Sequence, residues 1–407
     1  ASGVNSIATP PNHPDTVLIN VRNASNGTTH GIYQSFDAGS SWALSNFNPT
    51  TLGWGGLGDN SKIYTIAYHP SIHNLVFVGT SRGLFRSVDG LQSWTQLLSN
   101  AEIVDIAFHP TDPSIVYLYD TYYWGNNQSA VLRSTDIGLS FSSSANLAGN
   151  NDANGIISTT AACPNCVYFA SNNGVWRSDD AALSFSFLSN PNESCDGFAV
   201  SDIDSLHLIY GYLDSHASSD GGYSFNQVTD WANGNPDSSY IHADLRVAQC
   251  INGVFYVGTD GYLAKSIDNG ISWERLNDGT GIREFYAVGL SQSNYKVQMA
   301  GSQDNGTSIL ADTGWIEWNG GDGMEAVVQP LNDQWMIGSW QYGTRNRTQD
   351  GGFSRQGIGS PNGGNGDWIA PLYLDPNEQM KVLHFSDRLY SSDEFGDGWD
   401  SLGVGGI

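Results

Sequence analysis

Residues 266–273 read SIDNGISW, an octet that has the composition of a turn but ends in a tryptophan. Related octets recur along the 407-residue chain and begin at Ser35, Ser87, Ser134, Ser178, Ser218, Ser266, Thr348 and Ser391. Their third residues are Asp37, Asp89, Asp136, Asp180, Asp220, Asp268, Asp350 and Asp393. The interval between the sixth and seventh octets is about twice the usual one, so we expect a degenerate ninth copy around Asp312 to Trp318.

The residues around each octet alternate between apolar and polar side chains. In the second repeat, four segments each suit a short strand: 62–70 (KIYTIAYHP), 75–81 (LVFVGTS), 83–89 (GLFRSVD) and 93–98 (SWTQLL). Four strands per repeat are typical of one blade of a β-propeller, whose faces are buried only against neighbouring blades. We therefore predict an all-β chain that forms a single β-propeller of about nine four-stranded blades over residues 1–407, with eight or ten blades as alternatives.

The octet falls on the turn between the third and fourth strands of each blade. Its serine and aspartate can satisfy backbone N–H groups of the turn, and its glycine tolerates a positive φ where the chain reverses. The final aromatic residue then packs into the blade. Because a catalytic group would not be needed in eight peripheral copies, we interpret the octet aspartates as structural.

The pattern Ser-x-Asp-x-Gly-x-Ser/Thr-Trp resembles the Asp box of BNR-repeat propellers, and the resemblance covers nearly the whole chain. It implies a kinship with secreted or surface-displayed bacterial propellers, with sortilin-type receptors and with xyloglucanases. Sialidases of this group carry an Arg-Ile-Pro segment, which is missing here. Xyloglucanases place one catalytic aspartate from each of two propellers across a cleft, which a single ring would not complete.

Composition narrows the choice of partners. Asp and Glu number 41 against 16 Lys and Arg, which gives a net charge of −25. Such a surface repels phosphate backbones, so we expect no nucleic-acid partner. No run of about 18 apolar residues occurs, so no membrane span is expected. The start of the sequence shows no charged-then-apolar leader, so any export signal is expected to have been removed already.

Cys163 and Cys166 stand close together in ACPNCVYF, at an expected turn between strands. A zinc site would need a second Cys/His pair at ligand spacing, and the sequence has none. A local disulfide is our prediction, and two free thiols are the alternative.

The loops opposite the octet turns are long and rich in aromatic residues. Flat aromatic faces beside amide and carboxylate groups suit sugar rings, although the same residues can seal contacts between blades. The candidate ligand-binding residues are Trp54, Tyr122, Tyr123, Trp124, Trp231, Trp340, Tyr342 and Trp368.

Two acidic segments are expected on the same face, in adjacent blades. GSQDNGTS carries Asp304, and GGDGMEA carries Asp322 and Glu325. These three residues are the candidate acid and base if the chain is a hydrolase, and otherwise they cap strand ends. They lack the spacing of a calcium loop, so we predict no cofactor and keep Ca²⁺ as a weak alternative.

Three functions remain open at this point. The first is a non-catalytic, secreted or cell-surface module that binds a polysaccharide or a surface partner. The second is a glycoside hydrolase related to the xyloglucanases. The third is a protein-binding scaffold of the sortilin type.

Overall fold

The structure is a computed structural model that describes residues 2–23, 25–55, 60–121, 129–146, 154–231, 239–276, 279, 283–311, 314–361 and 366–402. Across these residues the chain forms nine four-stranded sheets, together with the short helix α1 (Pro49–Leu52) and a 3₁₀ turn (Gln341–Gly343). In every sheet the four strands lie side by side in chain order, and neighbouring strands are antiparallel. The prediction of an all-β chain with nine four-stranded units is confirmed.

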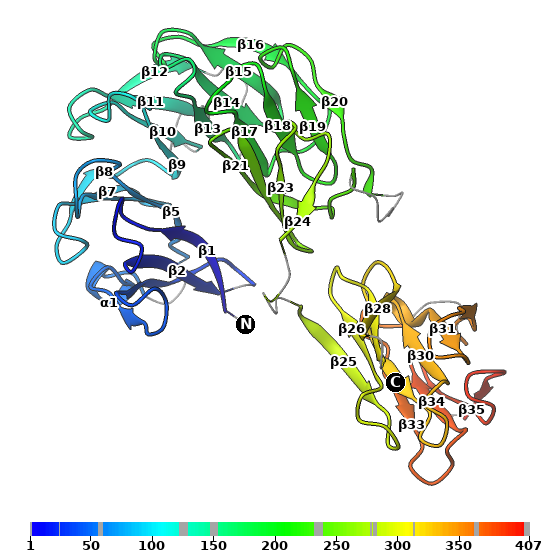
Figure 1. Cartoon of the computed structure of the whole chain (residues 1–407). Coiled ribbons are helices and arrows are strands. Elements are labelled where there is room, and N and C mark those ends of the chain that lie inside the picture. Colours follow the sequence, from blue (N-terminus) through cyan, green and yellow to red (C-terminus); the bar gives the residue numbers. More distant parts are fainter. Residues whose placement is uncertain are drawn as a thin grey trace. The chain divides into compact units, whose positions relative to one another are not determined.

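The chain divides into two compact units, which Figure 1 shows. Unit 1 spans Ala1–Leu276 and contains sheets 1 to 6. Sheets 1 to 3 consist of β1 (Ser2–Ala8), β2 (Val17–Asn23), β3 (Thr29–Ser35), β4 (Ala43–Leu44); β5 (Ile63–Tyr68), β6 (Val76–Thr80), β7 (Gly83–Ser87), β8 (Thr95–Leu98); and β9 (Ile103–Phe108), β10 (Val116–Asp120), β11 (Ala130–Ser134), β12 (Ser142–Asn146). Sheets 4 to 6 consist of β13 (Ile156–Thr159), β14 (Val167–Ser171), β15 (Gly174–Ser178), β16 (Ser186–Ser189); β17 (Gly197–Val200), β18 (Leu208–Gly211), β19 (Ser215–Ser218), β20 (Asn226–Gln227); and β21 (Leu245–Ile251), β22 (Val254–Thr259), β23 (Leu263–Ser266), β24 (Glu274–Arg275).

Unit 2 spans Asn277–Ile407 and contains sheets 7 to 9. These consist of β25 (Phe285–Leu290), β26 (Gln298–Ser302), β27 (Thr307–Ala311), β28 (Gly314–Asn319); β29 (Ala326–Val328), β30 (Met336–Ser339), β31 (Arg345–Thr348), β32 (Gln356–Gly357); and β33 (Leu372–Leu374), β34 (Val382–Phe385), β35 (Leu389–Ser392), β36 (Asp400–Ser401). Strand β28, which begins at Gly314, is the fourth strand of the degenerate repeat expected from the sequence.

Within each unit the first strands of successive sheets are neighbours. In unit 1 these contacts run from β1 to β5 and onward to β21, and in unit 2 they run from β25 through β29 to β33. The second strands are the most buried, because both of their faces meet an adjacent sheet; all five residues of β6, β10 and β14 are buried. The apolar core is therefore a series of layers between sheets, as propeller blades require.

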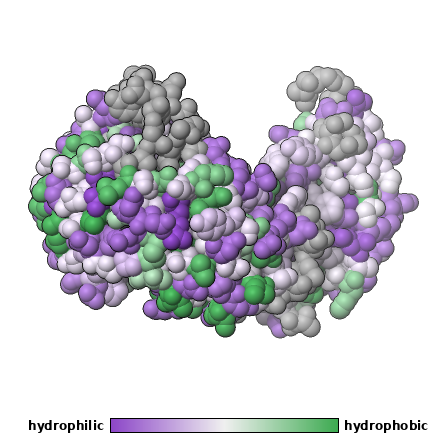
Figure 2. Space-filling model, turned by 90° about the horizontal axis from the view of Figure 1, so that it is seen from above, coloured by the Kyte–Doolittle hydropathy of each residue, from purple (hydrophilic) through white to green (hydrophobic). Residues whose placement is uncertain are grey.

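Figure 2 shows hydrophilic residues over most of the face in view, with hydrophobic side chains in small separate groups. Scattered exposed apolar residues of this kind are normal on a folded protein.

The octet that opened the sequence analysis forms a closed set of hydrogen bonds. Ser266 Oγ donates to Asp268 Oδ1 over 2.8 Å and accepts from the Gly270 N–H over 2.8 Å. The Asp268 carboxylate accepts from the backbone N–H of Ser272 over 2.8 Å and from its hydroxyl over 2.6 Å. Gly270 has a φ of 88°, and Trp273 is buried. The octet thus ties a sharp turn together and anchors it in the core.

The predicted position of the last octet is wrong by one residue. In sheet 9 the hydroxyl that accepts from the turn belongs to Ser392, which receives the N–H groups of Glu394 and Gly396 over 3.4 and 3.0 Å. Glu394 therefore occupies the place of the octet aspartate. Asp393 is exposed, and its carboxylate lies 3.7 Å from Lys381 Nζ. Counted from Ser392, Gly396 and Trp399 take the fifth and eighth places of the octet, so the spacing of these two residues was the signal for the correct alignment.

Asp180→Ala is expected to lower the free energy of unfolding by about 1–2 kcal/mol, because the Ser184 and Leu183 N–H groups lose their acceptor. Hydrogen bonds, first that from the Ser184 side chain, lower the pKa of Asp180 from 3.8 to about 2. A carboxyl with a depressed pKa stabilises the fold above pH 3.8 and loses that effect as the pH falls toward 2. Thermal melts of both proteins should therefore converge at low pH. Asp393 makes none of the octet hydrogen bonds, so Asp393→Ala should change the free energy of unfolding little. An equal loss in both variants would contradict the structural role of Asp180.

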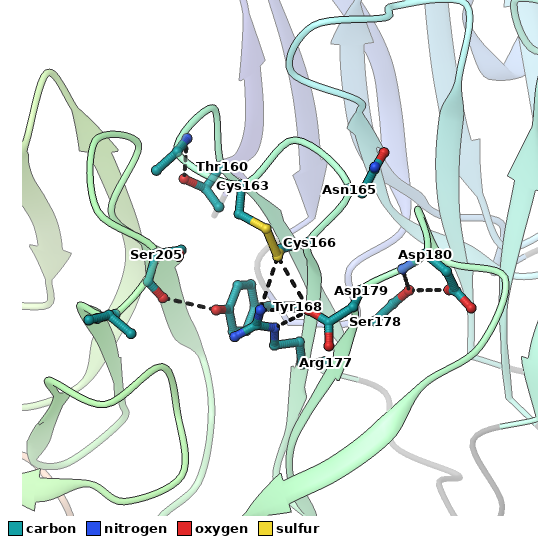
Figure 3. The surroundings of a disulfide bond; sticks show 12 residues. Thr160, Cys163, Asn165, Cys166, Tyr168, Arg177, Ser178, Asp179, Asp180 and Ser205 are labelled. Atoms are coloured by element: carbon teal, nitrogen blue, oxygen red, sulfur yellow. Dashed lines mark hydrogen bonds and ion pairs between the residues drawn. A yellow bond between two sulfur atoms is a disulfide. The ribbon is translucent and has the colours of Figure 1, made fainter.

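Cys163 and Cys166 are joined by a disulfide at the turn between β13 and β14. Figure 3 shows that Arg177 lies beside this bond, and its Nη2 donates to the sulfur of Cys166 over 3.2 Å. The same nitrogen lies 2.6 Å from Asp179 Oδ1, so the guanidinium charge is paired locally. The disulfide thus stiffens a turn that sheet 4 also holds through hydrogen bonds.

Asp105, on β9, links the first strands of sheets 3 and 4. Its Oδ2 accepts from the Ile157 N–H over 2.7 Å, and its Oδ1 accepts from the Ile106 N–H over 2.9 Å. Burial nevertheless dominates and raises the pKa of Asp105 from 3.8 to about 6. A serine makes the corresponding link between sheets 4 and 5, where Ser158 Oγ accepts from the Val200 N–H over 3.1 Å.

Asp105→Asn is expected to raise the melting temperature at pH 8 by about 3 °C. Because the pKa of Asp105 is higher in the folded state, its protonated carboxyl stabilises the wild-type fold below pH 3.8. This contribution to the free energy of unfolding is lost as the pH rises through about 6. The neutral amide keeps one acceptor for Ile157 without burying a charge. Calorimetric melts at pH 5 and pH 8 should show the gain mainly at pH 8. Asp112→Asn, at an exposed turn in the same sheet, should show no such gain; a gain independent of pH would refute the explanation.

Candidate functional site

The octet turns lie at one end of the sheets, and the connections between second and third strands lie at the other end, as do those from a fourth strand to the next sheet. In unit 2 this second end carries all six of the residues predicted as ligand-binding or catalytic. Asp304 lies between β26 and β27, Asp322 and Glu325 between β28 and β29, Trp340 and Tyr342 between β30 and β31, and Trp368 between β32 and β33. We call these six residues the unit 2 cluster.

Asp304 and Asp322 are brought together from neighbouring sheets. The Asp304 N–H donates to Asp322 Oδ1 over 3.0 Å, and Asp304 has a left-handed φ of 55°. Gln341 Nε2 lies 3.4 Å from Asp322 Oδ2, so the other oxygen also has a donor nearby. Asp322 is therefore held as an acceptor between two turns, an orientation that suits either ligand recognition or loop anchoring.

Tyr342 and Trp368 form an aromatic pair with exposed edges. Their rings meet edge to face with centroids 5.5 Å apart, and they remain 48% and 38% exposed. The Tyr342 N–H donates to the Trp368 carbonyl over 3.2 Å, and Trp368 Nε1 lies 3.4 Å from the hydroxyl of Tyr286. That hydroxyl donates to Gln303 Oε1 over 2.9 Å. The pair is thus fixed from both sides and open to solvent, as a platform for a sugar ring would be.

Trp340 serves the scaffold more than the surface. Its Nε1 donates to the Gly320 carbonyl over 2.7 Å, and the Arg355 guanidinium lies 5.9 Å from its ring centroid. Arg355 in turn donates to Asn319 Oδ1 over 2.9 Å. Trp340 therefore joins the Asp322 loop to the turn that carries Tyr342, and a direct ligand contact stays a prediction.

Glu325 has the most unusual setting of the three acids. Its backbone exchanges hydrogen bonds with Ser339, since its N–H donates to Ser339 Oγ and its carbonyl accepts from the Ser339 N–H, both over 2.9 Å. Among the described residues no group hydrogen-bonds to its half-buried carboxyl. Burial raises the pKa of Glu325 above the ordinary glutamate value. A carboxyl that keeps its proton to higher pH is the type of group that acts as a general acid.

Unit 1 contains an open pocket of about 1320 Å³, lined by residues 51–54 at the end of α1, by sheet 2 and by residues 99–102 just before β9. Trp54 lines it, but the ring is buried and packs edge to face on Phe47 and Phe85, so its exposed part is small. The Arg82 guanidinium lies 5.9 Å from the Trp54 ring centroid. Trp54 is thus chiefly a core residue, and its contact with a ligand stays a prediction.

The same pocket includes two residues that sequence reasoning missed. The Tyr64 hydroxyl donates a hydrogen bond to Glu102 Oε1 in the next sheet, and burial together with this carboxylate raises the pKa of Tyr64. Both residues lie at the start of first strands, where the sequence shows only a polar position in an alternating run. The two residues do not share a repeat position, because Tyr64 corresponds to Val104 and Glu102 to Lys62, so the repeat gave no signal for this pair.

The remaining predicted aromatic residues divide into two cases. Trp231 is 52% exposed on unit 1, and its N–H donates to Asp214 Oδ1 over 2.8 Å. Tyr122, Tyr123 and Trp124 lie outside the described residues.

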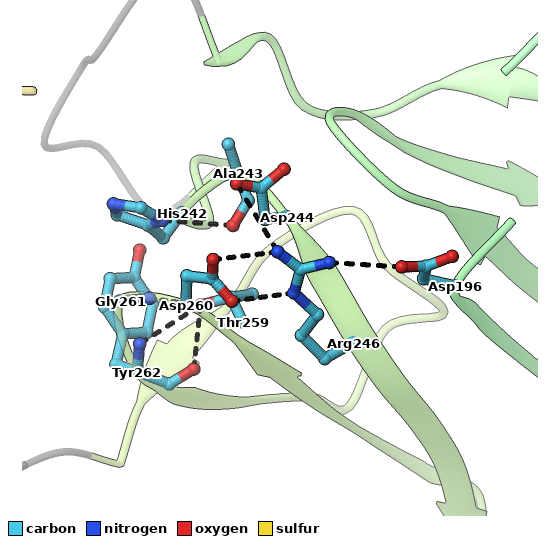
Figure 4. Close-up of polar contacts among 9 residues, drawn as sticks. All are labelled: Asp196, His242, Ala243, Asp244, Arg246, Thr259, Asp260, Gly261 and Tyr262. Carbon is cyan, nitrogen blue, oxygen red and sulfur yellow. Dashed lines mark hydrogen bonds and ion pairs between the residues drawn. The ribbon is translucent and has the colours of Figure 1, made fainter. Parts of the chain in front are cut away.

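A polar cluster at sheets 5 and 6 accounts for several acidic residues. Figure 4 shows Arg246 between Asp196, Asp244 and Asp260. Its Nε lies 2.7 Å from Asp260, its Nη1 lies 3.1 Å from Asp196, and its Nη2 lies 3.9 Å from Asp244. Hydrogen bonding to Asp260 is the main reason that the pKa of Arg246 is raised. We interpret this cluster as a cross-link between neighbouring sheets.

No group of three or more His, Cys, Asp and Glu side chains is placed to hold a metal ion in the part of the chain that the structure describes. In the same residues no helix is long and apolar enough to cross a membrane. A calcium role for Asp304, Asp322 and Glu325 stays untested.

Comparison with known proteins places these features in context. No protein-family model matches the chain. A xyloglucanase from Paenibacillus sp is 26% identical over 247 residues, which cover 56% of this chain and 22% of that enzyme. The matched region is thus a minor part of the relative's length.

Several solved structures share the fold. The GH74 enzyme of Niastella koreensis has a TM-score of 0.72 at 15% identity, covering 100% of this chain and 66% of that one. The GH74 xyloglucanase of Xanthomonas campestris has a TM-score of 0.70 at 14% identity, covering 100% and 67%. PorZ of Porphyromonas gingivalis, a surface component of the type-IX secretion system, has a TM-score of 0.54 at 13% identity, covering 99% and 53%. The chain therefore has a β-propeller fold and is similar to xyloglucanases.

Proposed function

We propose that the chain acts on a neutral polysaccharide of the xyloglucan class as a glycoside hydrolase, and that the unit 2 cluster binds the sugar chain. The observation that carries this proposal is the exposed Tyr342–Trp368 pair at the same end of unit 2 as the acids Asp322 and Glu325. The similarity to a xyloglucanase supports the substrate class. The net charge of −25 favours a neutral polymer over an acidic one.

Each residue has a role under this proposal. The aromatic pair stacks on the apolar face of a sugar ring, and Asp322 with Gln341 receives hydroxyl groups at its rim. Glu325, which keeps its proton to a raised pH, donates that proton to the glycosidic oxygen as the bond breaks. Asp322 is the candidate base that would activate the attacking water. Secretion or surface display, as the resemblance to BNR-repeat propellers implies, would bring the protein to such a substrate.

A second candidate is a module that binds the polysaccharide without cleaving it. Both Asp322 oxygens already have donors from the chain, Asp304 N–H at 3.0 Å and Gln341 Nε2 at 3.4 Å. A carboxylate engaged in this way is less available as a base, which favours recognition over cleavage. The two candidates share the same site and differ in whether a bond is broken.

The test is incubation of the chain with xyloglucan, followed by measurement of both retention in an affinity gel and release of reducing ends. Polygalacturonate, an acidic polymer, is the control substrate. Retention with release supports the hydrolase, and retention alone supports the binding module. Binding of neither polymer would overturn both candidates and favour a protein partner.

A further inference from the structure

Arg345 is a buried cation without a counter-ion. It is the first residue of β31 and is 0% exposed. Its Nε and Nη1 have no hydrogen-bond partner, and no carboxylate forms an ion pair with it in the described parts of the chain. Guanidinium groups stay charged in proteins, and an isolated buried charge is strongly destabilising. The fold therefore contains a positive charge that calls for an anion.

Two further buried polar groups lie beside Arg345, in the last repeat. The Arg345 guanidinium lies 5.0 Å from the ring centroid of Trp399, whose buried Nε1 has no partner among the described residues. Arg345 Nη2 contacts Nδ1 of His384, and the imidazole centroid lies 6.1 Å from that of Trp399. His384 Nε2 is also buried without a partner in the described region. Nδ1 also lies 3.2 Å from the Pro371 carbonyl oxygen. In the tautomer in which Nδ1 accepts from Arg345, Nε2 carries the proton and is a donor.

The cluster carries one positive charge. Burial, and next the charge of Arg345, lower the pKa of His384 from 6.5 to about 4, so the imidazole is neutral at physiological pH. The nearby Asp387 is engaged elsewhere, since it accepts from the Tyr390 hydroxyl over 3.1 Å and from Arg388 Nε over 3.2 Å. A single negative charge would therefore neutralise the cluster.

The turn that contains Gly343 packs closely against Arg345 and His384. Gly343 has a φ of 83°, and a Cβ there would lie 3.0 Å from Ala370 Cβ, 3.2 Å from His384 Cε1 and 3.3 Å from Arg345 Nη2. This close packing leaves no room for a side chain at Gly343, and a ligand at this place would have to be small. Arg347, the next arginine on the same side of β31, is also buried, but its charge is paired. It lies 2.8 Å from Asp397 and donates to the Phe395 carbonyl over 3.0 Å.

We propose that Arg345, His384 and Trp399 bind a small monovalent anion, such as chloride, between sheets 8 and 9. The anion supplies the charge that Asp397 supplies to Arg347, and it accepts from Arg345 Nη1 and Trp399 Nε1. His384 Nε2 is a further donor when Nδ1 of the same ring accepts from Arg345. A spherical anion suits donors that come from separate segments of the chain. The site is separate from the proposed polysaccharide function and does not depend on it.

The test is a thermal melt of the full chain at pH 8 and constant ionic strength, with sodium gluconate exchanged stepwise for sodium chloride or bromide. Because a ligand that binds only the folded state stabilises it, the melting temperature should rise by about 3 °C between 1 and 100 mM halide. Arg345→Met should abolish this rise. Arg347→Met, which removes the paired arginine, should lower the melting temperature at every halide concentration and keep the rise.

Crystals of the wild type soaked in bromide provide a second readout that does not depend on folding of a variant. Anomalous density should appear in hydrogen-bond reach of Arg345 Nη1 and Trp399 Nε1. Trp399→Phe, which removes one donor and keeps most of the ring, should reduce the halide effect without abolishing it. The proposal would be overturned if halide did not change the melting temperature of the wild type, or if Arg345→Met showed an equal rise. It would also be overturned if the site in the soaked crystals held water and no bromide.

Discussion

Glu325→Gln should lower the rate of xyloglucan cleavage at least a hundredfold while it leaves the affinity for the polymer almost unchanged. The amide has the shape of the carboxylic acid but cannot donate its proton to the departing sugar oxygen. Reducing-end release and gel retention, measured on the same preparations, separate the two effects. Glu317→Gln, the same change at an exposed position of β28, is the matched control and should cleave like the wild type.

The pH dependence gives the same prediction a second test. Burial raises the pKa of Glu325, so its protonated form persists above the ordinary glutamate range and is lost as the pH rises further. Cleavage should therefore fall on the alkaline side at a pH above that typical of an exposed glutamate. A Glu325→Gln enzyme with the wild-type rate would remove Glu325 from the mechanism and return the choice to the binding module.

Trp368→Ala should weaken binding of xyloglucan oligosaccharides roughly tenfold or more, since a stacked indole contributes on the order of 1–2 kcal/mol. Trp368 is fixed by Tyr342 and Tyr286, so the wild type loses little conformational freedom on binding. Isothermal titration calorimetry with a soluble oligosaccharide measures the loss.

Trp315→Ala is the control for this prediction. Trp315 is 56% exposed on β28 of the same unit but does not belong to the unit 2 cluster. Its removal should leave the dissociation constant unchanged. If both variants bind equally well, or lose affinity equally, the Tyr342–Trp368 pair is not the sugar platform.

The repeat made the fold predictable, because each octet carries its own turn chemistry. Ser266, Asp268 and Gly270 make the bonds that their residue types suggest, and the same set recurs from sheet to sheet. The prediction failed where the sequence is degenerate: in sheet 9 two adjacent serines precede the turn, and Ser392 takes the role that had been given to Ser391. Whether the nine sheets belong to a single domain stays a prediction.

The candidate site was predictable only in part. Loop position placed Asp304 and Asp322 at one end of neighbouring sheets, and they are in contact. The depth of a side chain could not be predicted in the same way, since Trp54 looked like a surface aromatic and is buried against Phe47 and Phe85.

The partners of charged residues in strands were even harder to predict from the sequence. RNRT in β31 places Arg345 and Arg347 on the same side of the strand, and the sequence does not show that one has a carboxylate partner and the other has none. Tyr64 and Glu102 likewise meet across two sheets, a contact that depends on packing between repeats.

The most direct test of the central claim is electrophoresis of the wild-type chain in native gels with and without xyloglucan. If the unit 2 cluster is a polysaccharide site, the wild type should be retarded by xyloglucan, and Trp368→Ala should migrate nearly as it does in a plain gel. Identical migration of the wild type in both gels would contradict the claim, since neither the hydrolase nor the binding module can act on a polymer that it does not bind.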